Sequence, residues 1–71
     1  MKKLLWQSYE SRERIIIFYM DRQHRVTGRY IRVLEMHDES LLAYCYFRKE
    51  VRSFRIENIL SAGTAGRRVG A

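Results

Sequence analysis

Apolar and polar residues alternate along most of the chain, and this pattern predicts a succession of short strands. The first apolar run, "IIIFYM", is β-branched and aromatic, which favours a strand. A later run, "LLAYCYF", alternates with a period of two, so that Leu41, Ala43, Cys45 and Phe47 share one face. Strands are therefore expected over residues 14–22, 26–37, 41–47 and 51–56, with a possible short fifth strand over 60–63.

The beginning of the chain follows a helical period instead. Leu4, Leu5, Ser8 and Tyr9 recur at helical spacing in a segment without glycine or proline. A short amphipathic helix is therefore expected over residues 2–11, with Leu5 and Tyr9 facing inward. Polar segments between the apolar runs predict turns at 21–25, 38–40 and 48–50, and "ENI" at 57–59 predicts a single 3₁₀ turn.

Five short strands joined by hairpins in 71 residues predict a mainly β fold, a small antiparallel barrel with a short N-terminal helix. Gly28 is expected to provide the bulge or bend that lets such a barrel close. The barrel is expected to span residues 1–62, followed by a flexible basic tail over 63–71. The residues expected to be buried are Ile15, Ile17, Leu34, Ala43, Cys45, Phe54 and Ile59.

The charge of the chain favours polyanionic partners. Fourteen Lys and Arg residues against eight Asp and Glu residues give a net charge of +6. Arginine predominates, and its planar guanidinium group binds phosphates and stacks on aromatic rings. The stretch 43–60, "AYCYFRKEVRSFRIENIL", sets arginines beside tyrosines, which is typical of surfaces that stack bases and neutralise phosphates. A merely solubilising surface charge is the alternative.

Catalysis, metal binding and membrane insertion are not expected. Cys45 stands alone, and with His24 and His37 it lacks the spacing of a zinc site, so neither a metal nor another cofactor is expected. His37 and Asp38 are neighbours in an extended segment and would point to opposite faces, and no nucleophile elbow is present. The first apolar patch is too short for a signal peptide, and no segment could span a membrane, so a cytoplasmic location is expected.

The stretch "LLAYCYFRKEVRSFRIENILSA" resembles the second half of a WYL domain. In that family the strand-turn-strand core runs Leu-x-Ala-Tyr-Cys-x-x-Arg, then three residues, then Arg-x-Phe-Arg, and then an Ile that closes a short turn. "LLWQSYESRERIIIFY" is similar to the lead-in helix and first strand of the family, which ends in a tyrosine, here Tyr19. The positions that match the core without a gap are Leu41, Ala43, Tyr44, Cys45, Arg48, Arg52, Phe54, Arg55 and Ile59.

Several features depart from the family. Glu39 and Ser40 stand where the Trp and Tyr of the Trp-Tyr-Leu tripeptide fall, Asn58 replaces an arginine, and Arg32 stands where proline is common. Family members often carry a helix-turn-helix before this module and act as transcription regulators. We expect a small stand-alone member without that element.

The resemblance implies an SH3-like, Sm-type small β-barrel that senses a nucleic-acid-like ligand, as in bacterial regulators of defence and DNA damage. Single-stranded DNA, RNA or a nucleotide are the expected ligands. Our hypothesis is that Arg48, Arg52 and Arg55, with Tyr44, contact a phosphate-bearing ligand at one end of the barrel. The full set of candidate ligand-binding residues is Arg48, Arg52, Arg55, Tyr44, Tyr19 and Arg29.

Structural roles remain open for several of these residues. Arg52 could form an ion pair with Glu50 or Glu57, Tyr44 could belong to the core, and Arg48 could be a solvated turn residue. A second function is also open: a protein-interaction barrel, either a self-assembling Sm-like homo-oligomer or an accessory to a regulatory protein partner. That function predicts an exposed apolar patch around Trp6 and Leu4.

Overall fold

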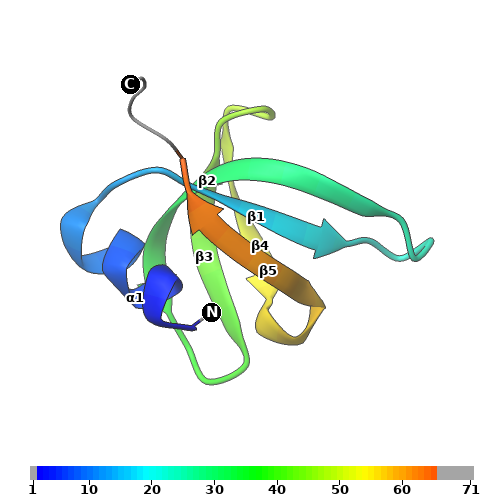
Figure 1. The fold of residues 1–71 in the computed structure, drawn as a ribbon, viewed down its shortest axis with the longest axis horizontal. Coiled ribbons are helices and arrows are strands. Elements are labelled where there is room, and N and C mark those ends of the chain that lie inside the picture. The colour runs from blue at the N-terminus through cyan, green and yellow to red at the C-terminus, as the bar shows by residue number, and fades with distance from the viewer. Residues whose placement is uncertain (1, 66–71) are drawn as a thin grey trace.

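Residues 2–65 are described by a computed structural model, which contains one helix and five strands in the order expected from the sequence (Figure 1). The helix covers the expected residues, whereas every strand differs from expectation by one or two residues at one or both ends. The elements are α1 (Lys2–Ser11), β1 (Ile15–Met20), β2 (Val26–Met36), β3 (Ser40–Cys45), β4 (Glu50–Arg55), the 3₁₀ turn η1 (Ile56–Asn58) and β5 (Ile59–Thr64).

The strands form one antiparallel sheet in the order β4-β3-β2-β1-β5. The mainly β, SH3-like architecture expected from the sequence is therefore confirmed. The sheet curls without closing into a complete barrel: β4 and β5 are its two edges, and no ladder joins them in the described part of the chain. The turn η1 separates these two strands along the chain, so they do not form a hairpin.

The core lies on the concave face of the sheet and under α1. Six of the seven residues expected to be buried are buried, and the exception is Leu34, which is half-buried. Ile31 and Val33 take the inward positions on β2, so Leu34 between Val33 and the shifted Glu35 has the opposite phase. The buried apolar residues are Leu5, Ile15, Ile17, Ile31, Val33, Leu41, Ala43, Cys45, Phe54 and Ile59.

Gly28 does not provide the expected bulge. It pairs with Phe18 in an unbroken β1–β2 register, and the irregularities lie at Val33/Glu35 and, between β1 and β5, at Phe18/Tyr19. A Cβ atom on Gly28 would lie 3.2 Å from Cε1 of Phe18. Glycine at this position therefore leaves room for the Phe18 ring across the strand pair.

The inward side of α1 is formed by Leu5 and Ser8, whereas Tyr9 is exposed, contrary to expectation. Ser8 is 1% exposed, and its hydroxyl donates a hydrogen bond to the Glu13 carbonyl at 2.7 Å and accepts one from the Val33 N–H at 3.1 Å. Val33 lies beyond the Ile15–Ile31 pair at which the β1–β2 ladder ends. The helix thus satisfies a strand amide that β1 does not reach, which explains why a polar residue is buried here.

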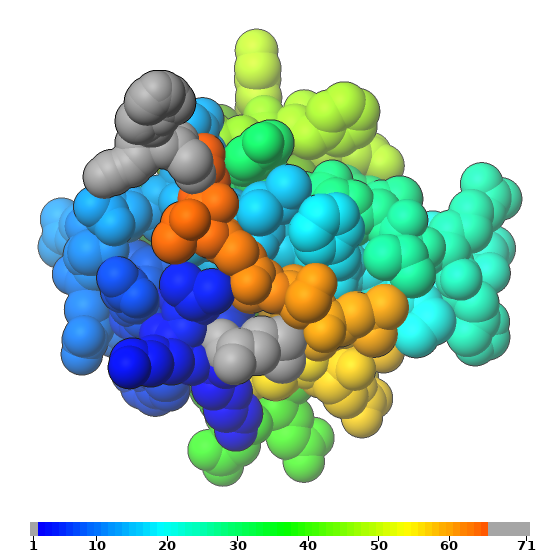
Figure 2. All heavy atoms as spheres, in the orientation of Figure 1, coloured from blue at the N-terminus to red at the C-terminus, as the bar shows by residue number. Residues whose placement is uncertain are grey.

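The β1–β2 hairpin and the β3–β4 turn are among the connections that project from the body (Figure 2). The hairpin tip is built by Asp21, whose Oδ1 accepts hydrogen bonds from the N–H groups of Gln23 and Arg25, each at 2.9 Å. Aspartate stabilises turns in this way by accepting hydrogen bonds from the backbone N–H groups that follow it.

In the β3–β4 turn, Phe47 is 80% exposed rather than on the inward face of β3 as expected. The reason is that β3 ends at Cys45, whose carbonyl accepts a hydrogen bond from the Lys49 N–H at 2.7 Å and so closes the turn. At the other end of the chain, β5 continues through Thr64, past the start of the expected tail. Residues 66–71 of that tail lie outside the described residues.

Candidate functional site

The convex face of the sheet, opposite the core, carries a row of exposed aromatic and apolar side chains. Phe18, Tyr30, Tyr46 and Val51 are 41%, 45%, 37% and 53% exposed. They come from neighbouring strands, because Phe18 lies on β1, Tyr30 on β2, Tyr46 directly after β3 and Val51 on β4. We call these four residues together with Tyr44 the aromatic face. Apolar side chains that gather on one face in this way make it a candidate binding surface.

Arg14 is held at this face by two tyrosines. Its guanidinium carbon lies 5.3 Å from the centroid of the Tyr30 ring and 5.7 Å from that of Tyr46. The two tyrosines are neighbours because the Tyr46 N–H donates a hydrogen bond to the Tyr30 carbonyl at 3.1 Å. Cation–π contact orders the guanidinium group while leaving its N–H edge able to bind an anion.

Tyr44 extends the same cluster along β3. Its ring meets that of Tyr46 edge to face, with centroids 5.1 Å apart. The residue is half-buried and pairs with Arg32 on β2 and Val51 on β4. Its half-burial would fit either the core or the surface, but its strand partners place Tyr44 on the convex face.

The cations at this face are not neutralised by carboxylates. In the described part of the chain, the salt bridges join Arg52 to Glu50, Arg55 to Glu57 and His37 to Glu35. Within residues 2–65, Arg14, Arg32 and Arg48 make no salt bridge. The aromatic face therefore combines stacking surfaces with positive charge that is free to meet a polyanion.

Two of the candidate ligand-binding residues belong to this region. Tyr44 is part of the aromatic face, and Arg48 is exposed in the turn that follows Tyr46. Arg52 lies elsewhere: it pairs with Ala43 and so shares the phase of the core-facing residues, at the rim of edge strand β4. Arg52 Nη1 lies 3.6 Å from Glu50 Oε2, so Arg52 forms the ion pair with Glu50 that was the alternative to a ligand-binding role. Because both side chains are about half exposed, this pair contributes at most about 1 kcal/mol.

Arg48 and Arg55 are not brought to one end of the sheet. Arg48 lies in the turn beside the Cys45–Glu50 pair, whereas Arg55 pairs with Ser40 at the opposite end of β4 (Figure 1). Arg55 is also engaged by Glu57, with Nη2 and Oε2 2.9 Å apart. A single ligand at one end of the sheet thus cannot contact both arginines as the sequence hypothesis required.

Tyr19 and Arg29 also lie away from the aromatic face. The half-buried Tyr19 packs against the core, with its ring centroid 5.0 Å from that of Phe54. Arg29 is half-buried on β2 and pairs with Ile17, in the phase of the core-facing residues. Their positions follow from strand alternation, because residues of the same parity as Ile15 and Ile31 face inward.

Arg14 and Tyr30 were absent from the candidate residues. A signal for both exists in the sequence: the alternation that turns Ile15 and Ile17 inward turns Arg14, Ile16 and Phe18 outward. The sequence does not reveal that Ile16 pairs with Tyr30. This pairing places the start of β1, and with it Arg14, beside Tyr30 and Tyr46.

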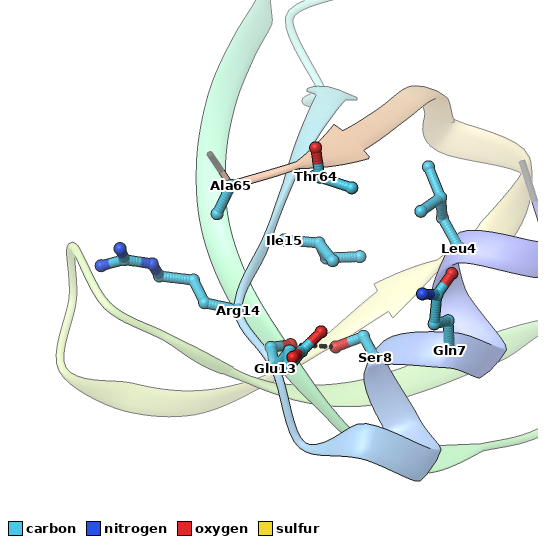
Figure 3. Close-up of a pocket in the computed structure, with 8 residues that line it drawn as sticks. All are labelled: Leu4, Gln7, Ser8, Glu13, Arg14, Ile15, Thr64 and Ala65. Carbon is cyan, nitrogen blue, oxygen red and sulfur yellow. Dashed lines mark hydrogen bonds between the residues drawn. The ribbon is translucent and has the colours of Figure 1, made fainter. Parts of the chain in front are cut away.

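A hollow of about 360 Å³ lies between α1 and the ends of β1 and β5 (Figure 3). The Ser8 hydroxyl on its wall is already bonded to Glu13, and the Arg14 side chain extends away from the hollow in the close-up. Leu4, Ile15 and Ala65 supply apolar lining. Gln7, Glu13 and Thr64 supply polar lining, and the Glu13 carboxylate makes this hollow less suited to a polyanion than the aromatic face.

Other kinds of site receive no support from the described residues. Among them, no three His, Cys, Asp or Glu side chains gather in a way that could hold a metal ion. None of the helices in residues 2–65 has the length and apolar character needed to cross a membrane.

The fold and its convex aromatic face define a small SH3-like β domain. Its fold is similar to part of the solved structure of proteasome accessory factor B/C (PafBC) of Arthrobacter aurescens, with a TM-score of 0.83 and 24% sequence identity. The match covers 99% of this chain but only 12% of that one, so the chain corresponds to a small part of the larger protein. No protein-family model and no curated protein matches the sequence. The similarity thus shows the fold.

Proposed function

We propose that this chain is a non-catalytic binding module that holds single-stranded nucleic acid on its aromatic face. The observation that carries the proposal is the Arg14 guanidinium ordered between Tyr30 and Tyr46 on a face of exposed rings. Rings stack on bases of any sequence, and arginines neutralise the phosphates between them. Sheets that bind RNA in this way stack roughly two or three bases on their aromatic residues.

We further infer that the module is of WYL type and serves a regulatory role. The gapless match from Leu41 to Ile59 supports this inference, and the SH3-like fold is consistent with it. The net charge of +6 favours a polyanionic ligand over a neutral one.

The experiment is a fluorescence-anisotropy titration with a labelled oligothymidylate of about 12 nucleotides, within the usual site size of small single-strand binders. We expect binding at low salt and a log–log salt slope of about −0.7 for each phosphate contacted. Tyr30→Ala should weaken binding by removing a stacking ring, at a cost of about 1–3 kcal/mol. Trp6→Ala, which removes an exposed ring from α1, is the matched control and should bind as the unmodified chain does.

The role of Arg14 is tested with a charge-matched control. Arg14→Ala and Arg22→Ala remove the same charge, but Arg22 lies at the tip of the β1–β2 hairpin. Arg14→Ala should therefore weaken binding more than Arg22→Ala does. Equal losses would mean that only net charge attracts the strand, and absence of binding at low salt would refute the proposal.

One observation favours a second candidate function, a protein-interaction module. Trp6 is exposed on α1 and meets the Tyr9 ring edge to face, with centroids 5.6 Å apart. Trp6 belongs to the apolar patch, around Trp6 and Leu4, that was expected for a protein-interaction module. If no single strand binds, and if Trp6→Ala alters the mass of the molecule in solution, the interaction function replaces nucleic-acid binding.

A further inference from the structure

A second hollow lies between the end of α1 and the bulged part of β2. It measures about 430 Å³ and is lined by Tyr9, Glu10, Arg12, Arg32, Val33 and Leu34. This volume falls within the range of roughly 300–1,000 Å³ that is typical of small-molecule sites. Val33 and Leu34 in this lining lie where the β2–β3 register is irregular.

The hollow presents two guanidinium groups without acidic partners. Within residues 2–65, neither Arg12 nor Arg32 makes a salt bridge or a side-chain hydrogen bond, and Arg32 is half-buried. Glu10 is the one carboxylate among the lining residues, so the hollow keeps a net positive charge. Guanidinium groups bind phosphates through short charge-assisted hydrogen bonds, so a lining with two arginines favours a phosphate.

Arg12 occupies a backbone position that favours another residue. Its φ of 63° is left-handed, and its N–H caps α1 by donating a hydrogen bond to the Ser8 carbonyl at 2.8 Å. Glycine is preferred at this position after a helix because a Cβ atom is strained there. Stability by itself would favour glycine, whereas arginine supplies a charged side chain to the hollow.

We propose that this hollow binds the terminal phosphomonoester of a nucleotide, either free or at the phosphorylated end of a single strand. Arg12 and Arg32 bind the phosphate, the half-exposed Tyr9 ring packs against the base, and Glu10 accepts a hydrogen bond from a base amine or a sugar hydroxyl. The strand-end form rests on the proposed function, since Arg32 pairs with Tyr44 and so joins the hollow to the aromatic face. The free-nucleotide form stands independently of it.

The experiment compares oligothymidylates with and without a terminal phosphate, at the 5′ end and at the 3′ end, together with free deoxythymidine monophosphate. A phosphorylated end should bind about tenfold more tightly than the matching unphosphorylated strand, as charge-assisted hydrogen bonds imply. Arg12→Gly should abolish this difference while melting at the same or a higher temperature. The difference should also shrink below about pH 6, where the phosphomonoester loses its second charge.

Two control variants separate this proposal from the proposed function. Tyr30→Ala should weaken both strands and preserve the ratio between them, whereas Arg12→Gln tests the side chain without changing the backbone preference to that of glycine. Equal binding of the two strands with no binding of the mononucleotide would overturn the phosphate site and leave the aromatic face intact. Binding of the mononucleotide that Arg12→Gly removes, without binding of any strand, would uphold the site and refute the proposed function. A phosphate effect that survives both Arg12 variants would also overturn the site.

Discussion

The rings of Tyr19 and Phe54 meet edge to face, with centroids 5.0 Å apart and planes at 83°, although β2 and β3 lie between their strands in the sheet. The contact exists because the sheet curls until β1 and β4 approach each other across the core. The ring pair belongs to the same core cluster as Leu41, the strand partner of Phe54. This relationship gives Tyr19 a packing role, whatever its contribution to ligand binding.

The first prediction concerns the coupling between these two rings. A double-mutant cycle with Tyr19→Leu and Phe54→Leu should give an interaction energy of about 0.5–1.5 kcal/mol, because aromatic pairs contribute this much beyond burial. Phe54→Ala by itself should cost about 3–5 kcal/mol, enough to unfold most of so small a domain. Urea unfolding of the four proteins measures the coupling, and additive effects would show that the rings do not stabilise each other.

A second prediction concerns the buried hydroxyl of Ser8. Ser8→Ala leaves the Val33 N–H and the Glu13 carbonyl without their partner, and it should lower the free energy of unfolding by about 1–3 kcal/mol. Ser11→Ala is the matched control on the same helix, since the Ser11 hydroxyl bonds the Gln7 carbonyl at 2.7 Å but is exposed. The control should change stability by less than about 0.5 kcal/mol. Equal effects of the two substitutions would contradict a bridging role for Ser8.

A third prediction compares the contributions of Arg48, in the turn before β4, and Arg55, on β4, to binding of a single strand. Arg48→Ala should flatten the salt slope for a single strand by about one phosphate contact, because the exposed Arg48 is near the aromatic face. Arg55→Ala should change the slope less, since Arg55 is paired with Glu57 at the other end of the strand. Titrations at several salt concentrations measure both slopes. A larger effect of Arg55→Ala would move the binding surface to the opposite end of β4.

A fourth prediction concerns the thiol of Cys45, which is free and completely buried. A thiol reagent should react with it only when the domain opens, so the reaction should be slow in buffer and rapid in denaturant. The more stable the variant, the slower the reaction should be, and Ser8→Ala should accelerate it. Rapid reaction of the native protein would show that the β3 position is exposed and that the strand register is wrong.

The sequence by itself determined the elements and most of the core. Local periodicity was sufficient, because a strand alternates its side chains wherever it pairs and a helix repeats its apolar positions whatever it packs against. Residues such as Ile17, Cys45 and Phe54 could therefore be assigned to the interior without knowing their neighbours. The hairpin tip at 21–25 was predictable for a similar reason, since its turn is built by its own residue Asp21.

Only the tertiary structure decided the positions that depend on register. The register shift between β2 and β3 moved the inward positions of β2 from Ile31 and Val33 to Met36, and the end of the β1–β2 ladder left an amide for Ser8 to bind. A regular alternation assumes a single phase along the strand, whereas a bulge changes that phase at a position that depends on the partner strand.

The candidate site was likewise predictable in part from the local sequence pattern and in part only from the tertiary structure. The sequence predicted that arginines and tyrosines would share one surface, and Tyr44 does lie beside Tyr46 on the aromatic face. It could not indicate that Arg14 would meet Tyr30 and Tyr46, residues that lie 16 and 32 positions further along the chain. That contact requires β1 beside β2 and β2 beside β3, and the order of strands in a sheet is set by the packing of the whole core rather than by any segment alone.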